Sequence, residues 1–183
     1  NKKYHGFESN MEKSKRVSTE KDIDDMMETY NEWMDEGFMH LGCRDEALWP
    51  KVSYLHNKEI LANHFIDGNE LSKFIDDVDW NVCQIGEDHL FTIECMRRGY
   101  MNRVSDEFLQ NRWSSAYDEG GCAEYRTAEF HDKEMMKLAQ KYPEFITLRK
   151  MREVKKIGTI RHFYFHWNRI YESSQSASLE GFL

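Results

Sequence analysis

Residues 80–104 carry the pattern that most restricts the fold of this chain. The alternating segment 80–85 is typical of a strand and leads into Gly86. Glu87 and Asp88 then open a segment with the spacing of a helix, and Gly99 follows its last turn. Its apolar positions are Leu90, Phe91, Ile93, Cys95 and Met96. Residues 100–104 read as a second strand, so the order strand, acidic turn, helix, glycine and strand predicts an α/β fold.

Similar signals predict the elements on either side. A helix is expected over residues 19–35, capped by Ser18 or Thr19 and ended by Gly37. Its apolar stripe, which we expect to lie in the core, consists of Ile23, Met26, Met27, Tyr30 and Met34. Strands are expected at 38–43, 52–56 and 60–66, and a short helix at 68–77. Thr127 caps a further helix to about residue 142, followed by a strand at 145–148, a basic turn, and an alternating strand at 158–167.

Length and composition set the class of protein. A chain of 183 residues fits one domain, which we assign to residues 1–172, with the small polar residues 173–183 as a flexible tail. Aromatic residues make up 14% of the chain, which disfavours disorder. No stretch approaches the roughly 20 apolar residues of a membrane span, so we expect no membrane partner and a cytoplasmic location. The four cysteines form no CxxC pair, which predicts reduced thiols.

Charge is unevenly distributed along the chain. The formal net charge is −8, yet residues 149–183 contain seven Lys/Arg and three Asp/Glu. A protein that coats nucleic acid is normally basic throughout, so any contact with phosphates must come from local patches. The basic segment at 149–161 is the strongest candidate, although charge runs of this kind are also typical of a solvated hairpin. Its candidate phosphate contacts are Lys150, Arg152, Lys155, Lys156 and Arg161.

Glu87 and Asp88 are the sharpest local candidates for chemistry. Ligands of open α/β sheets bind at the carboxyl ends of strands, where a strand-to-helix turn lies. The helix dipole favours negative charge there, which suits both residues to accept a proton or bind a hydroxyl. Acids are also common helix starters, and spacing alone favours that plainer interpretation.

Two further segments supply candidate ligand contacts. Gly120 and Gly121 could hinge a loop over a substrate, with Cys122 and Tyr125 in it and Arg126 binding a phosphate. Arg44 could reach a ligand at the end of its strand. An ordinary surface loop and a solvated arginine are the plainer alternatives. The histidines form no HxH or HExxH pattern, although His162 and His166 would share a strand face with Tyr164 between them, so a histidine metal site has little support.

Taken together in order, these segments resemble the TET-associated glycosyltransferase family. The helix at 19–35 and the segment 35–42 after it are similar to the family's region behind its metal motif. The Glu87-Asp88 helix ends in a Gly99-Tyr100 turn like the family's Glu-Asp helix, and residues 120–127 are similar to its Gly-Gly-Cys…Tyr-Arg-Thr loop. That loop is the more specific signal, because Glu-Asp alone occurs in many glycosyltransferases.

The resemblance implies a GT-A-like, Rossmann-related three-layer sandwich and a sugar transfer. The donor would be a nucleotide sugar, the acceptor a hydroxymethylated pyrimidine in DNA, and the cofactor a divalent Mn or Mg ion. Asp88 or Glu87 would orient or deprotonate the acceptor hydroxyl. The family's Asp-rich metal motif and nucleotide-binding strands precede the part that matches this sequence, so we expect the acceptor-side, C-terminal portion here and assign no metal ligands. If the protein is phage-encoded, the cytoplasm would be that of the host.

Two alternatives remain at this stage. The chain could be a glycosyltransferase-like module that binds nucleic acid or a partner without catalysis. It could also be an active transferase whose acceptor is a protein or a glycan. Oligomeric state, the identity of the sugar and the stereochemical outcome have no signal in the sequence.

Overall fold

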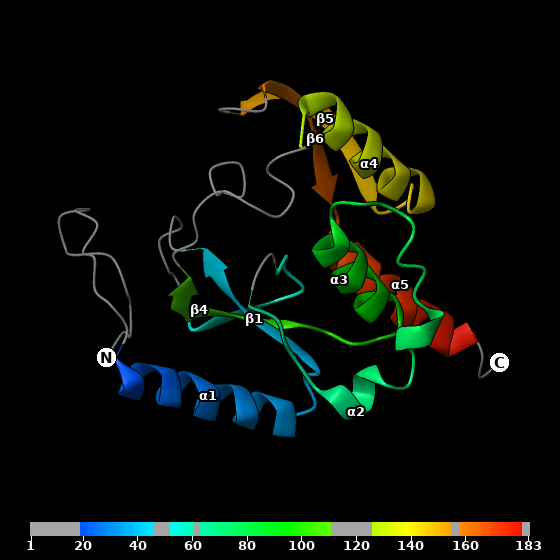
Figure 1. The fold of residues 1–183 in the computed structure, drawn as a ribbon. Helices are drawn as coiled ribbons and strands as arrows, with labels where there is room; N and C mark the ends of the chain where they lie inside the picture. Colours follow the sequence, from blue (N-terminus) through cyan, green and yellow to red (C-terminus); the bar gives the residue numbers. More distant parts are fainter. Residues whose placement is uncertain (1–18, 46–51, 61–62, 111–125, 155–157, 181–183) are drawn as a thin grey trace.

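The computed structural model of the chain describes residues 19–45, 52–60, 63–110, 126–154 and 158–180 (Figure 1). These residues form both helices and strands. In chain order the elements are α1 (Glu20–Asp35), β1 (His40–Asp45), β2 (Tyr54–His56), β3 (Phe65–Ile66), α2 (Gly68–Leu71), the 3-10 helix η1 (Ile75–Asp77), α3 (Glu87–Arg97), β4 (Arg103–Gln110), α4 (Ala128–Lys141), β5 (Ile146–Val154), β6 (Gly158–Phe165) and α5 (Trp167–Glu180).

Four of the strands form a mixed sheet of order β2-β4-β1-β3. β1 and β4 are parallel neighbours, and the segment that joins them contains α3. β3 pairs antiparallel with β1, and β2 pairs antiparallel with β4. A parallel pair needs a crossover of this kind, because a short turn cannot return the chain to the same end of the sheet. The predicted α/β class is therefore confirmed, as a mixed sheet with helices.

The helices α1 and α3 lie on opposite faces of β1. Leu41 is fully buried in one cluster with Tyr30 and Trp33 of α1. The ring centroid of the preceding His40 lies 4.9 Å from that of Phe91 on α3. Successive side chains of a strand point to opposite faces, so this single step along β1 separates the two layers.

The capping residues of α1 follow the prediction, but its buried face does not. Thr19 forms a capping box with Asp22, and the helix ends just before Gly37, whose φ is +96°. Ile23 and Met27 are exposed, whereas Tyr30 and Trp33 are the buried apolar residues of this helix. The assignment of Ile23 and Met27 to the core is wrong.

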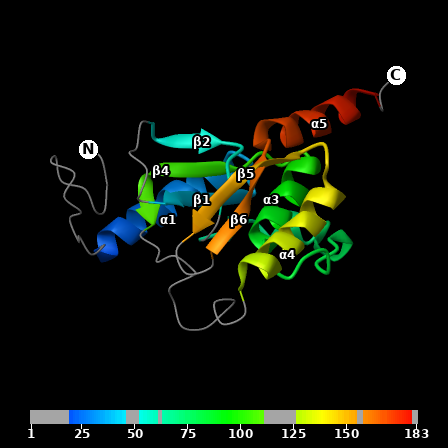
Figure 2. The same ribbon diagram turned by 90° about the horizontal axis from the view of Figure 1, so that it is seen from above.

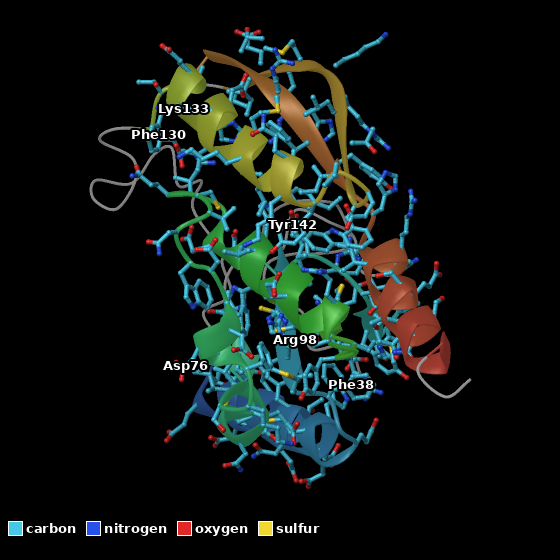
Figure 3. All side chains as sticks on the ribbon, turned by 90° about the vertical axis from the view of Figure 1, so that its right-hand side faces the viewer. Phe38, Asp76, Arg98, Phe130, Lys133 and Tyr142 are labelled. Carbon is cyan, nitrogen blue, oxygen red and sulfur yellow. The ribbon has the colours of Figure 1, made fainter. Side chains whose placement is uncertain are left out.

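α3 is the centre of the larger core (Figure 3). Every residue from Leu90 to Met96 is buried, which confirms the five predicted apolar positions and adds Thr92 and Glu94. The Glu94 carboxylate accepts hydrogen bonds from Tyr142, at the end of α4, and from Arg98. Burial alone would raise the pKa of Glu94, but these bonds and the nearby arginines outweigh it and lower that pKa.

The C-terminal part of the described chain packs around α3. Thr127 caps α4 as predicted, with its hydroxyl accepting from the Phe130 amide. α4 packs against β6 of the two-stranded β5–β6 hairpin, and α5 packs against α3 (Figure 2). Among the described residues, Cys83 and Cys95 are free thiols, in agreement with the reduced thiols expected. No helix in the described part of the chain has the length and apolar character needed to cross a membrane.

Three further local predictions are wrong. Residues 80–85 form turns and not a strand, because Cys83 and Ile85 bury in the core while the Gln84 amide donates to the Glu134 carboxylate at 2.8 Å. Most of the expected basic turn is instead strand β5, paired with β6 from Ile146 to Val154. The expected tail continues as α5 to Glu180, where serine hydroxyls such as that of Ser173 donate to helix carbonyls.

Candidate functional site

The acidic pair lies at the amino end of α3, where a glycine sets the turn. Gly86 is the N-cap residue with φ +86°, a conformation that favours glycine, and a Cβ there would lie 3.0 Å from the sulfur of Met135. Glu87 is exposed and the Asp88 side chain is 25% exposed. The His89 amide donates to Asp88 Oδ1 at 2.8 Å. Both carboxylates are therefore accessible, and one of them is held by the backbone.

His89 joins this turn to the C-terminal elements. Its ring centroid lies 4.5 Å from that of Phe165, the last residue of β6, and 6.2 Å from that of Trp167 at the start of α5. His89 Nδ1 is 3.2 Å from Glu59 Oε1, an ion-pair distance, although the ring is not oriented for a hydrogen bond. The acidic turn is thus fixed to the hairpin by stacking.

A pair of histidines, His40 of β1 and His64, lies near this turn. His64 Nδ1 is 3.0 Å from Nε2 of the fully buried His40, and the two rings are stacked. Burial lowers the pKa of His64, while the charges of Asp88 and Glu87 act in the opposite direction. These carboxylates therefore lie close enough to His64 to affect its protonation.

The charge state of His40 favours one tautomer for the pair. Burial, followed by the adjacent His64, lowers the pKa of His40 to about 3, so this ring is neutral near pH 7. His40 Nδ1 is buried and has no hydrogen-bond partner. A buried N–H without an acceptor is rarer than a buried acceptor without a donor. We therefore place the His40 proton on Nε2, which donates to His64 Nδ1. The proton of neutral His64 is then on Nε2.

Cys83 borders the same turn but does not suit nucleophilic chemistry. It is buried, and burial, with the charges of Glu134, Glu87 and Asp88, raises the pKa of its thiol to about 11. The thiolate is the reactive form of cysteine, so a thiol with this pKa is inert near neutral pH.

The other predicted ligand contacts do not join this turn in the described structure. Arg44 is partly buried and paired with a carboxylate: its Nη1 lies 2.6 Å from Oδ1 of Asp106, whose side chain is fully buried. Arg126 lies just before the α4 cap and near His131, whose pKa is lowered mainly by burial. Gly120, Gly121, Cys122 and Tyr125 lie outside the described residues.

The predicted phosphate contacts are split between the strands of the hairpin. Lys150 and Arg152 are exposed on β5, and Arg161 is exposed on β6. The Arg161 amide donates to Asp132 Oδ1 of α4 at 2.9 Å. Lys155 and Lys156 lie outside the described residues.

Sequence reasoning missed the histidines around the acidic pair. His89 is adjacent to Asp88, and that adjacency was a usable signal. His64 comes from a different element, just before β3, and only the pairing of β3 with β1 brings it to His40. Among the described residues no group of three or more His, Cys, Asp or Glu side chains could hold a metal ion.

Comparison of the chain with protein-family models, with curated proteins and with solved structures finds no match.

Proposed function

We propose that this protein transfers a sugar from a nucleotide sugar to the hydroxyl of a hydroxymethylated pyrimidine in DNA. The proposal extends the resemblance to TET-associated glycosyltransferases and takes the fold as the acceptor-side part of a GT-A-like domain. The observation that supports it best is the accessible Glu87–Asp88 pair, at the amino end of the helix that joins the parallel strands β1 and β4. Carboxylates placed in this way can bind and deprotonate an alcohol.

In the proposed reaction, Asp88 accepts the proton of the acceptor hydroxyl. The hydroxyl oxygen forms a bond to the anomeric carbon of the sugar, and the bond from that carbon to the diphosphate oxygen breaks. The nucleoside diphosphate leaves with the electron pair of that bond. Glu87 assists in orienting the acceptor, and His64, with its proton on Nε2, supplies a hydrogen-bond donor beside the two carboxylates.

A base within a duplex cannot reach the acidic turn of a folded domain. Enzymes that modify bases act on single strands or extrude the nucleotide from the stack. We therefore propose that the acceptor base is unpaired when it reacts. The acidic character of the chain disfavours close approach of a duplex over most of the surface.

The test is mass spectrometry of nucleosides from DNA incubated with the protein and a panel of nucleotide sugars. We expect a hexose-sized mass increase on hydroxymethylated pyrimidines and none on unmodified DNA. Asp88→Asn should abolish transfer and keep the wild-type circular dichroism spectrum, whereas Asp24→Asn, at an exposed position of α1, should keep activity. Full activity of Asp88→Asn would remove the proposed role of this residue.

A nucleic-acid-binding module without catalysis is the second candidate. It is favoured by the cationic β5–β6 hairpin, whose exposed side chains do not depend on the acidic pair. Binding of DNA without mass transfer from any donor would support this function. Sugar appearing on a protein or glycan acceptor, with none on DNA, would point instead to a transferase of another specificity.

A further inference from the structure

The β5–β6 hairpin leaves an unusual amount of strand surface open. Residues 147–153 of β5 are all exposed, including Leu148 and Met151. One face of β6 packs toward α4, where the ring of Phe163 contacts His131. In the view from above, no other described element lies in front of the hairpin ribbon (Figure 2). The exposed side chains of β5 are therefore accessible to a partner.

The opposite face carries an ordered arginine–aromatic stack. The guanidinium carbon of Arg149 lies 3.6 Å from the ring centroid of Tyr164. Arg149 is paired with His162 across the hairpin, and Tyr164 with Thr147. The ring of His166 meets the Tyr164 ring edge-on at 4.9 Å, and His166 Nε2 lies 2.7 Å from Thr147 Oγ1. We call these five residues the platform.

Charge on the hairpin is opposite to that of the chain. Strands β5 and β6 contain four cationic side chains, Arg149, Lys150, Arg152 and Arg161, and one acidic side chain, Glu153. The formal net charge of the whole chain is −8. A polyanion is therefore attracted to this ribbon and repelled by much of the remaining surface.

We propose that the platform binds an unpaired strand of DNA. An unpaired base stacks on the plane formed by Arg149 and Tyr164, and the phosphates on either side contact the neighbouring cations. Arginine planes and tyrosine rings are the usual stacking partners of unpaired bases, because every base offers a π face. The Tyr164 ring already holds the guanidinium in place, so little side-chain freedom is lost on binding.

The position of the platform suits the proposed function, on which the choice of DNA rests. Phe165 contacts His89 of the acidic turn and pairs with Ile146 of β5. Arg149 is three residues further along β5, which corresponds to about 10 Å of extended strand. Phe165 and Arg149 lie on opposite faces of the ribbon, so a strand held on the platform would pass around the end of the hairpin beside His166 to bring a nearby nucleotide to Glu87 and Asp88.

The experiment is fluorescence anisotropy of a labelled 12-nucleotide oligothymidylate with the purified protein, without any sugar donor. We expect Tyr164→Leu and Arg149→Lys each to weaken binding about tenfold, the scale of one lost base stack. Tyr164→Phe retains the ring and should remain within about twofold of wild type. Lys21→Gln removes an exposed charge on α1 and serves as the control for electrostatics alone. The same sequence as a duplex should bind more weakly than the single strand.

Three results would overturn the proposal. They are unchanged binding by Tyr164→Leu, an equal loss in Lys21→Gln and Arg149→Lys, and duplex binding as tight as that of the single strand. If an RNA strand of the same length binds more tightly, the ligand of the platform is RNA and not DNA. Asp88→Asn should bind the oligonucleotide as tightly as the wild type does, because the platform does not include Asp88. If the wild-type protein binds DNA through the platform but transfers no sugar, only the proposed function is contradicted. Transfer that survives Tyr164→Leu without any loss of DNA binding would contradict only the platform.

Discussion

Replacement of Gly42 by alanine tests the packing of β1 against Ile60 and Asn63. A Cβ at this position would lie 2.6 Å from Cγ2 and 3.1 Å from Cγ1 of Ile60, and 3.2 Å from the backbone oxygen of Asn63. Carbon atoms in contact prefer about 3.5–4.0 Å, so the methyl group overlaps Ile60 by about 1 Å. Ile60 is fully buried, which leaves its side chain little room to move away.

The expected loss of stability follows from two opposing terms. Overpacking of a core costs about 1–3 kcal/mol. Alanine restricts the unfolded chain more than glycine does, which offsets about 0.4–1 kcal/mol. We therefore expect Gly42→Ala to lower the free energy of unfolding by about 1–2 kcal/mol, or the Tm by about 2–8 °C for a chain of this size.

Urea denaturation followed by circular dichroism measures this change, read as a lower midpoint with an unchanged slope. Gly68→Ala is the matched control, because a Cβ at Gly68 meets nothing within 4 Å. Ile60→Ala alone should cost about 2–5 kcal/mol. Ile60→Ala also removes both of the carbons that the new methyl group would overlap. The loss of stability in the double variant should therefore be at least about 1 kcal/mol smaller than the sum of the two single losses. Additive losses, or a Gly42→Ala variant as stable as Gly68→Ala, would refute the reasoning.

Three further predictions concern stability, each measured by urea denaturation. Thr19→Ala removes the capping box of α1 and should cost about 1 kcal/mol. The pKa of Glu94 is lower in the folded chain than its ordinary value of 4.5. The bonds of Glu94 with Arg98 and Tyr142 therefore stabilise the fold at pH values above 4.5. This contribution is lost as the pH falls below that value. Glu94→Gln should thus cost roughly 2 kcal/mol at pH 7 and much less at pH 3, whereas an equal cost at both would contradict the assignment. Arg103→Lys should cost about 1 kcal/mol, because the guanidinium stacks 3.7 Å from the Phe38 ring centroid; a neutral exchange would show that the stack contributes nothing.

The parts of the fold that the sequence predicts correctly carry local signals. Thr19 and Thr127 are caps whose hydroxyls bond amides within their own first turns. Gly37 and Gly99 have positive φ just past helix ends, where an alanine would be strained. Such signals need no knowledge of distant residues, and the helices α1, α3 and α4 were accordingly predicted within about two residues of their observed ends.

The wrong predictions concern segments whose partners come from elsewhere. Alternation at residues 80–85 reports burial of Cys83 and Ile85, but a strand also needs a neighbouring strand, and the Gln84 amide is taken by a carboxylate of α4. β5 has the opposite problem. It is exposed and rich in charge, so its sequence resembles a turn, and its pairing with β6 makes it a strand.

The candidate site divides in the same way. Glu87 and Asp88 could be found because Gly86 and a helix start mark them locally. His64 could not, because its place beside them depends on β3 pairing with β1. The platform was visible only in part: alternation places His162, Tyr164 and His166 on one face, but Arg149 joins them through the register of the hairpin.

The stack of His89, Phe165 and Trp167 gives the two proposals a common physical basis. The rings of Phe165 and Trp167 are 4.9 Å apart and nearly parallel, and His89 packs against both. β6 ends and α5 begins at this stack, while α3 begins two residues before His89, so three elements are joined where their ends meet. A side chain at the start of β5 therefore cannot move far from the acidic turn without breaking a buried aromatic contact. That constraint makes the distance from the platform to the carboxylates a property of the fold and not of a flexible loop.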